Sequence, residues 1–199
     1  MGAGSTEQRI VPFGEGRPAI VAAAVRLVAR EGLGKLTYRA LSAEAGVSVG
    51  SVQHHFSRVQ DVLEDALKLC VDTSLSYFVA PDSAENILEN LLDSVREHPE
   101  VSAFMFEIFL EARRQPHLLE IADRFRDLFR VRVRESFAAL SLEPDEPVVE
   151  ALLATAEGMA YGYVMHGEAH TPTTLKQSEG VRLLMAAYTQ ILQVQPHRP

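Results

Sequence analysis

Two adjacent histidines, His54 and His55, follow Gln53 in the stretch SVGSVQHHF, residues 48–56. Imidazole and amide groups can bind a metal ion, take part in acid–base catalysis or hydrogen-bond to DNA bases. Neighbouring residues of an α-helix point about 100° apart, so the two imidazoles do not easily face one ion. The pair therefore favours a binding surface, with His54 facing DNA and His55 in a structural role.

A second group that could do chemistry is His166, Glu168 and His170. The two histidines have the i, i+4 spacing that can hold zinc, but Glu168 is not where a zinc-hydrolase motif requires it. The segment also ends at Pro172, so a solvated helix end is favoured. No Ser-His-Asp or Cys-His candidate and no glycine-rich phosphate loop is present. We therefore predict no catalytic residue, no metal site and no cofactor, and keep a metal-dependent hydrolase as an alternative.

The charge of the chain is unevenly distributed. The net charge of −8 argues against a nucleic-acid partner, because neutralising phosphates requires clustered Lys and Arg. However, residues 1–58 contain seven basic and four acidic residues, which gives +3, and the remainder contains 12 basic and 23 acidic residues, which gives −11. This asymmetry indicates two modules with different partners.

Bulk features restrict the class of protein further. Cys70 is the single cysteine, which excludes an internal disulfide framework and a multi-thiolate zinc site. No run approaches the ~18 consecutive apolar residues of a spanning helix, and the start lacks the apolar core of a signal peptide. The sequence predicts a soluble protein of the cytoplasm, associated with the nucleoid if it binds DNA.

Helical periodicity dominates, so we predict an all-α fold. A first helix has Pro18 in its first turn and ends near Gly32. Thr37 is a good N-cap for a short second helix, Gly46 stops it, and Ser48 caps a third. Two helices joined by a turn this tight match the helix-turn-helix plan, in which the second helix enters the major groove.

The third helix has a short polar face. Its inward positions are Val49, Val52 and Phe56, and Gly50 and His54 point almost the opposite way. Across this face we expect three contacts with DNA. The Ser48 hydroxyl would donate a hydrogen bond to phosphate, the backbone at Gly50 would approach phosphate closely, and the Gln53 amide would bond to an adenine edge. Ser51 lies on the flank.

The chain is predicted to divide into residues 1–60, an N-terminal arm and DNA-binding domain, and residues 61–199, a regulatory, ligand-binding and dimerisation domain. Ser57 would cap a fourth helix, from about residue 58 to 78, that links a three-helix bundle to a larger helical bundle. The rest divides into about five helices at the stops Pro99, Pro116, Pro144 with Pro147, and Pro172. The segment 117–140 has one apolar face, typical of a core helix.

The last two helices, near 145–168 and 173–194, carry more apolar surface than one small bundle buries. An isologous dimer would cover the excess. The predicted dimer residues are Leu152, Ala156, Tyr163, Leu184, Tyr188 and Ile191.

Aromatic and methionine side chains in the second module are individually more often core than ligand contacts. Together with polar groups such as Glu157 and His166, they predict a pocket between helices for an unidentified small-molecule effector. The predicted ligand-binding residues are Phe104, Phe109, Phe125, Phe129, Met159 and Tyr161.

From Ile20 to about Leu67 the sequence resembles the TetR family of one-component bacterial regulators. The resemblance rests on LTYRALSAEAGVSVGSVQHHFSRVQDVLEDAL, in which the capped second helix, the AGVS turn and the aromatic end of the third helix have the family's spacing. Two later segments, FLEARRQPHLLEIADRFRDLFRVRV and EGMAYGYVMHGEAHTP, are weakly similar to the branch that contains the BetI repressors.

The resemblance implies a homodimeric, ligand-responsive regulator, usually a repressor, that binds a palindromic DNA operator and has a pocket in its larger domain. It also implies contacts with the DNA backbone. The predicted DNA-binding residues are Arg17, Thr37, Arg39, Ser48, Val49, Gly50, Ser51, Gln53, His54 and Arg58.

The chain departs from the family pattern at three positions. Gln53 replaces an aromatic residue, Val59 replaces a phosphate-contacting Lys, for which Arg58 is the expected substitute, and Ser42 replaces a packed Ala. These departures leave a third function open: a helical interaction protein whose degenerate DNA module binds weakly and without sequence preference.

Overall fold

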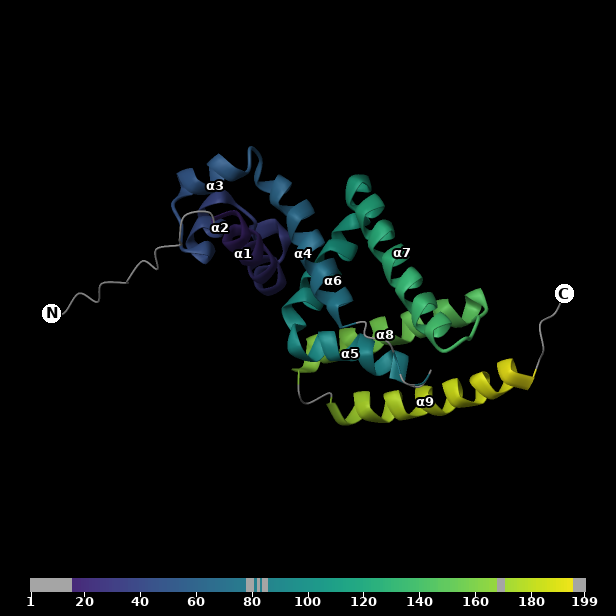
Figure 1. Cartoon of the computed structure of the whole chain (residues 1–199). Helices are drawn as coiled ribbons and strands as arrows, with labels where there is room; N and C mark the ends of the chain where they lie inside the picture. The colour runs from purple at the N-terminus through teal and green to yellow at the C-terminus, as the bar shows by residue number, and fades with distance from the viewer. Residues whose placement is uncertain (1–15, 78–80, 82, 84–85, 168–170, 195–199) are drawn as a thin grey trace. The chain divides into compact units, whose positions relative to one another are not determined.

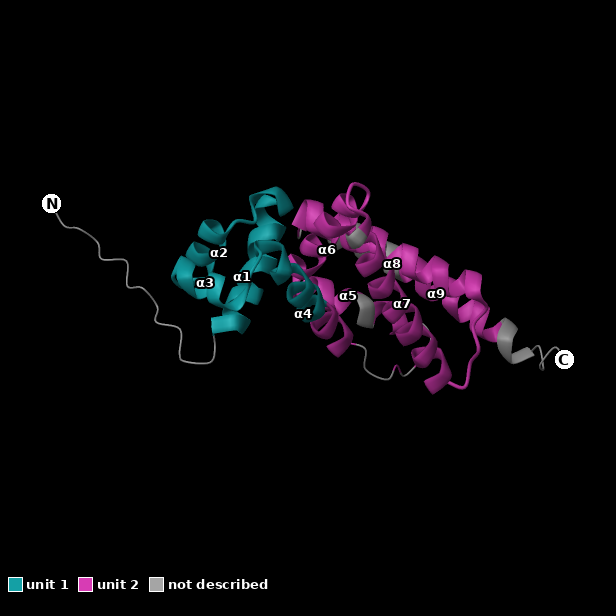
Figure 2. Cartoon of the chain, turned by 90° about the horizontal axis from the view of Figure 1, so that it is seen from above, with its two compact units in different colours: residues 1–70 teal, residues 71–199 magenta. Residues whose placement is uncertain are grey.

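A computed structural model of the protein describes residues 16–77, 81, 83, 86–167 and 171–194. Its regular elements are all helical, as predicted, and the chain separates into two compact units, Met1–Cys70 and Val71–Pro199 (Figure 2). The unit boundary lies later in the chain than the functional division predicted at 60/61, which stays a prediction. No helix in these ranges is long and apolar enough to cross a membrane.

The first unit is built on one long helix and a short helical pair (Figure 1). Its elements are α1 (Gly16–Glu31), the short 3-10 helix η1 (Leu33–Lys35), α2 (Tyr38–Ala45), α3 (Val49–His55), the 3-10 helix η2 (Val59–Asp61) and the first part of α4 (Val62–Ser76). The apolar side of α1 is fully buried at Ile20, Ala24 and Val28. This side is the core that fixes the helical pair.

The ends of α2 and α3 form where the sequence predicts them. The Thr37 hydroxyl oxygen accepts a hydrogen bond from the Ala40 backbone N–H at 3.1 Å, and Ser48 accepts one from Ser51 at 3.0 Å. Gly46 ends α2 with φ 68°, a left-handed conformation that costs glycine little. These local bonds set the turn between the two helices.

The predicted Ser57 cap is wrong. Arg58 occupies the N-cap of η2, where its backbone N–H donates to the Asp61 carboxylate at 2.9 Å, and α4 begins only at Val62. The carboxylate three residues ahead supplies the acceptor for this N–H, so a 3-10 turn precedes the α-helix.

In the described part of the second unit five helices follow the end of α4, in agreement with the prediction of about five from the prolines. They are α5 (Ile87–Glu97), α6 (Pro99–Ala112), α7 (Pro116–Ala139), α8 (Glu146–His166) and α9 (Thr171–Val194). Proline stands in the first turn of α6, α7 and α8, where its missing N–H costs nothing. The core joins α5, α7, α8 and α9 through Ile87, Phe137, Val149 and Met185, among others.

Candidate nucleic-acid interface and pocket

The outer face of α3 carries exposed polar side chains. Gln53 and His54 are exposed, and the Gln53 amide makes no hydrogen bond with any described residue. Val52 and Phe56 are buried at 0% and 2% exposure, as predicted, but Val49 is 38% exposed and is not an inward residue. Val49 is the first residue of α3, and its exposed side chain adds an apolar group to the polar face of the helix.

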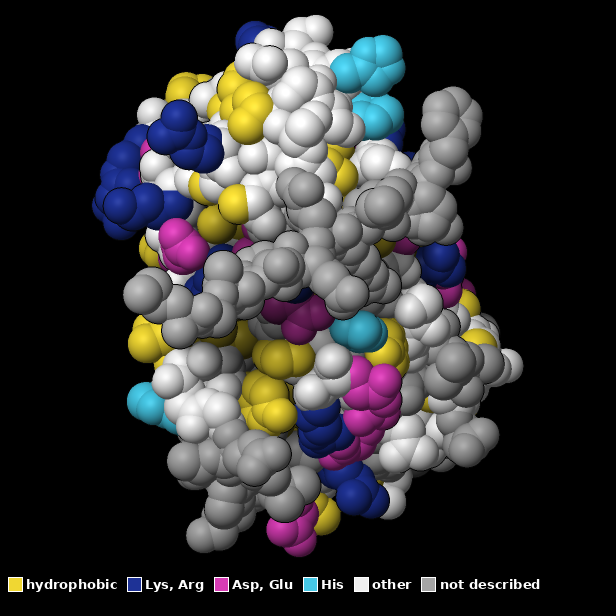
Figure 3. Space-filling view, turned by 90° about the vertical axis from the view of Figure 1, so that its left-hand side faces the viewer, with side chains coloured by type: hydrophobic (Ala, Val, Ile, Leu, Met, Phe, Trp, Pro, Cys, Tyr) yellow, Lys and Arg dark blue, Asp and Glu magenta, His cyan; other side chains and the backbone are white. Residues whose placement is uncertain are grey.

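The basic side chains do not share one patch with the histidines. Figure 3 shows histidine side chains exposed at one edge and a group of Lys and Arg side chains at another, with hydrophobic side chains, other side chains and backbone atoms between them. Cations and histidines therefore lie on different parts of this surface.

Gly50 has no packing reason to be glycine. A Cβ atom at this position would meet only the Ser48 hydroxyl oxygen, at an ordinary 3.8 Å. Glycine costs a helix about 1 kcal/mol relative to alanine, so the residue reduces stability without relieving any contact among the described residues. Its position on the exposed face is consistent with close approach of an external molecule.

The C-terminal end of α3 is held by two side chains from other helices. The Tyr38 hydroxyl donates to the carbonyl oxygens of Phe56 and Ser57 at 3.2 and 2.6 Å, and Arg17 donates to the carbonyl of His55 at 3.1 Å. These carbonyls would otherwise lack a helical partner. Both contacts therefore fix the direction of α3.

Replacing Tyr38 by phenylalanine is expected to lower the free energy of unfolding by about 1 kcal/mol, because it removes these bonds and keeps the ring. Urea unfolding followed by circular dichroism measures the change. Tyr161→Phe is the matched control, since Tyr161 is 54% exposed and should be neutral. Equal effects of the two changes would show that the Tyr38 hydroxyl does not stabilise α3.

Arg17 is engaged within its own unit. Besides the His55 carbonyl it contacts the Asp65 carboxylate at 2.7 Å and lies over the Phe56 ring at 4.4 Å. The predicted contact of Arg17 with the DNA backbone would compete with these partners, so its main observed role is to position α3 against α4. This role could not be predicted from the sequence, because Asp65 lies 48 residues away.

The other predicted cations differ in their partners. Arg39 is exposed and makes no ion pair within the described part of the chain, whereas Arg58 pairs with Asp61 at 2.8 Å but remains 79% exposed. Thr37 is exposed beside them, and its hydroxyl proton is still available to donate. Arg39 thus has the strongest claim to a phosphate among them.

Arg26 and Arg30 of α1 form an ion-pair cluster with Glu44 of α2. The distances from their guanidinium nitrogens to the carboxylate are 3.0 and 2.8 Å. Hydrogen bonds from Arg30 and then Arg26 hold the pKa of Glu44 below its usual value, against the opposing effect of burial. The cluster ties α1 to α2.

Because folding lowers the Glu44 pKa, the stabilisation is present above the ordinary carboxylate pKa of about 4.3 and is lost as the pH falls through the lower pKa of the folded state. Glu44→Gln should lower the free energy of unfolding by less than about 1 kcal/mol at neutral pH, since both arginines are solvated. Chemical denaturation across pH measures the difference from wild type, which should disappear in acid. A difference that grows in acid would contradict this assignment.

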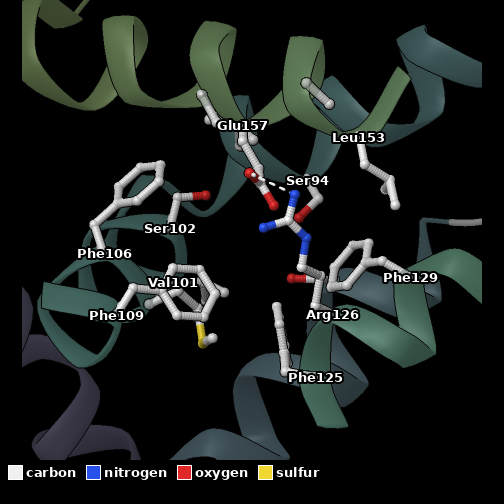
Figure 4. A pocket seen from close by; sticks show the side chains of 15 residues that line it. Ser94, Val101, Ser102, Phe106, Phe109, Phe125, Arg126, Phe129, Leu153 and Glu157 are labelled. Carbon is white, nitrogen blue, oxygen red and sulfur yellow. Dashed lines mark ion pairs between the residues drawn. The ribbon is translucent and has the colours of Figure 1, made fainter. Parts of the chain in front are cut away.

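A cavity of about 100 Å³ lies within the second unit (Figure 4). Its apolar walls combine Phe106, Phe109, Phe125 and Phe129 with aliphatic side chains such as those of Val101 and Leu153. Its polar groups are Ser74, Ser94, Ser102, Arg126 and Glu157. These five residues come from α4, α5, α6, α7 and α8, one from each helix.

Three of the six predicted ligand-binding residues line this cavity: Phe109, Phe125 and Phe129. Phe104 and Met159 do not, because they are buried in the core at 0% and 2% exposure. Tyr161 is 54% exposed and only packs edge-on against Phe106, with ring centroids 5.7 Å apart.

Arg126 was missed by the sequence analysis. Its guanidinium lies at the cavity below Glu157, and their charged atoms are 3.6 Å apart (Figure 4). Burial raises the pKa of Glu157, and the positive charge of Arg126 opposes the shift. The available signal was the i, i+4 series of arginines on α7 opposite acidic residues of α8.

The predicted dimer residues have different surroundings. Leu152 is 3% exposed and packs in the core, and Ala156 lines the cavity, so neither presents a free apolar surface. The Tyr188 hydroxyl accepts a hydrogen bond from the Asp145 N–H at 3.0 Å, and Tyr163 is half-buried. Leu184 is 72% exposed, while the Ile191 side chain lies outside the described part. Other exposed apolar residues of α8 and α9 are Tyr161, Met165 and Leu183.

The histidine group at the end of α8 cannot be assembled from the described residues, because Glu168 and His170 lie outside them. His166 is exposed. Among the described residues, no three His, Cys, Asp or Glu side chains lie close enough together to hold a metal ion.

Comparisons with known proteins agree with this architecture. Residues 20–66 match the model of the bacterial regulatory proteins, tetR family, and residues 80–190 match that of the tetracyclin repressor-like C-terminal domain. No protein of curated function matches the sequence.

Solved structures share the fold at low sequence identity. A putative TetR-family transcriptional regulator from Rhodococcus sp. is 22% identical with a TM-score of 0.70, over 86% of this chain and 98% of the other. A TetR transcription regulator from Haloarcula marismortui is 19% identical with a TM-score of 0.66, over 90% and 99%. A putative transcriptional regulator from Saccharomonospora viridis in complex with choline is 17% identical with a TM-score of 0.65, over 88% and 96%.

Proposed function

Because the chain belongs to the TetR family of bacterial regulatory proteins, we propose that it is a ligand-responsive transcriptional repressor. It binds a palindromic operator as a homodimer and is released by a small-molecule effector. The observation that carries the proposal is the exposed face of α3, where Gln53 is without an internal hydrogen bond on a helix capped and anchored at both ends. Such a helix is pre-organised to place side chains against base edges.

The residues proposed for DNA binding fall into two groups. Gln53, with His54 and Val49 beside it, would contact bases. A side-chain amide can form two hydrogen bonds with the major-groove edge of adenine, one to N7 and one from the N6 amino group. Arg39, Thr37, Ser48 and the backbone at Gly50 would contact phosphate, with Ser51 and Arg58 at the flanks. Arg17 is proposed to act by holding α3.

The aromatic cavity supports an effector site within the second unit. Apolar walls with a few polar groups are the usual composition of small-molecule pockets, and the Saccharomonospora viridis protein of the same fold is in complex with choline. Similarity to the BetI branch remains a prediction for this chain.

Exposed leucines on α9 support dimerisation. Leu183 and Leu184 are 68% and 72% exposed, which suits an isologous interface formed by α8 and α9. A dimer would present two copies of α3 to half-sites about 34 Å apart or a multiple of it.

One helix carries residues of both proposed sites. Asp65 of α4 pairs with Arg17, and Ser74 of the same helix lines the cavity. An effector that favours one position of α4 could therefore change DNA binding, to the extent of its differential affinity for the two states.

The family is one of transcriptional regulators and not of enzymes, which argues against the hydrolase alternative based on His166, Glu168 and His170. The degenerate DNA module remains a possible outcome of the test. A repressor of chromosomal genes would act in the cytoplasm at the nucleoid.

Selection of bound fragments from sheared genomic DNA by the purified protein, at moderate salt, tests the proposal. Recovery of one palindromic motif is the expected result. Recovery of fragments without a motif, with affinity that falls steeply with salt, would instead identify the degenerate module.

A further inference from the structure

The polar end of the cavity belongs to a series of ion pairs between α7 and α8. Arg134 pairs with Glu146, and Arg130 contacts Glu150 at 2.5 Å. The next arginine of the series is Arg126, one helical turn further along α7 and at the cavity.

The distance between arginine and carboxylate is longer at Arg126 than at the other positions of the series. The nearest carboxylate oxygens to Arg126 are those of Glu157 at 3.6 Å and Glu150 at 3.9 Å, both beyond hydrogen-bond distance. Glu150 is already held by Arg130. On α8 the residue one turn beyond Glu150 is Ala154, so the acidic partner that would continue the series is missing.

Arg126 is consequently under-satisfied. Its side chain donates no hydrogen bond to any described residue, and its Nε atom is buried without a partner. A buried donor without an acceptor is unfavourable. The side chain as a whole is nevertheless 38% exposed, so a molecule that enters the cavity can reach the guanidinium.

We propose that the effector is a monocarboxylate with an apolar body, whose carboxylate binds the Arg126 guanidinium and whose body packs among Phe109, Phe125 and Phe129. This inference rests on the proposed function, because it assigns a ligand class to the effector cavity. The planar guanidinium can hold a carboxylate by two parallel hydrogen bonds. The incoming group would supply the acceptors that Glu157 does not supply at 3.6 Å.

A cationic effector fits these charges less well. The aromatic walls and Glu157 could attract a quaternary ammonium group, but that group would lie beside the positive charge of Arg126. The Arg126 Nε atom is a hydrogen-bond donor without a partner in the described part of the chain, and a quaternary ammonium group has no acceptor to offer it.

Isothermal titration calorimetry of the full-length protein with three matched probes tests the ligand class. The probes are phenylacetate, the neutral phenylacetamide and the cationic benzyltrimethylammonium. We expect phenylacetate to bind at least about ten-fold more tightly than the other two. Octanoate, as a fourth probe, distinguishes an aliphatic from an aromatic body.

Two substitutions should act in opposite directions. Arg126→Met removes the carboxylate partner and should weaken phenylacetate binding about ten-fold or more. Glu157→Gln removes the competing carboxylate and should tighten it. Arg132→Met is the matched control, because Arg132 lies on the same helix, is exposed and, among the described residues, has its ion pair with Glu135 at 2.8 Å; it should leave binding unchanged.

The inference is overturned if no carboxylate probe binds, or if benzyltrimethylammonium binds best and Arg126→Met tightens it while Glu157→Gln weakens it. In that case a palindromic motif recovered from genomic DNA would still support the proposed regulator. Failure of the ligand class is thereby distinguished from failure of the function. Melting temperatures without ligand show whether each variant is folded.

Discussion

Replacing Gly50 by glutamate should weaken binding to the selected DNA by about a hundred-fold or more, because a carboxylate would face the phosphates that approach this position. The fold should survive the change. A side chain at residue 50 enters open space beside the Ser48 hydroxyl, and a carboxylate in the first turn of α3 is favourable with the helix dipole. Fluorescence anisotropy with labelled fragments measures affinity, and urea unfolding measures stability.

Two controls isolate the cause of this loss. Gly50→Gln adds a side chain of the same size without charge, so it should weaken binding less than glutamate. Gly34→Glu adds the same charge in the same unit, at a glycine whose Cβ position is also open. If Gly34→Glu matches the loss of Gly50→Glu, overall charge rather than contact at α3 controls binding.

The sequence predicted the helices of the first unit because their ends depend on local bonds. Thr37 and Ser48 each bond to a backbone N–H three residues ahead, and Gly46 supplies the left-handed turn. Such features involve neighbours in sequence, so types and spacing suffice. The N-cap was wrongly predicted at Ser57 because Asp61 accepts a hydrogen bond from the backbone N–H of Arg58, which makes Arg58 the N-cap.

Contacts between distant residues were not predictable in the same way. Arg17 has the type and place of a phosphate-binding residue, and only folding reveals Asp65 and the His55 carbonyl beside it. Leu152 belongs to a broad apolar surface of α8, but the sequence does not say which part of that surface α5 covers. Leu152 belongs to the same buried core cluster as Ile87 and Leu88 of α5.

The cavity shows the same limit. The aromatic and methionine side chains of the second module were recognised as a set, but helical periodicity does not distinguish Phe125, which lines the cavity, from Phe104, which is packed in the core. Arg126 was overlooked because a charged residue on a core helix is usually solvated. Arg126 is proposed to bind the effector because α8 has Ala154, and no acidic residue, at the position that would pair with it.

Gln53 and Arg39 should contribute to DNA binding in different ways. Gln53→Ala should lose about 1–3 kcal/mol of discrimination between the selected motif and variants of it, if the amide reads a base. The loss should be concentrated at one position of each half-site. Because Gln53 is exposed and makes no internal hydrogen bond, the substitution should not change stability.

Arg39→Ala should instead weaken binding to all sequences alike and reduce the dependence of affinity on salt, because one phosphate contact is lost. Affinities for the motif, its single-base variants and unrelated DNA, each at several salt concentrations, separate the two effects. Arg26→Ala is a control, since Arg26 is also a cation of this unit but is held by Glu44. Identical sequence profiles for Gln53→Ala and Arg39→Ala would show that Gln53 does not read a base.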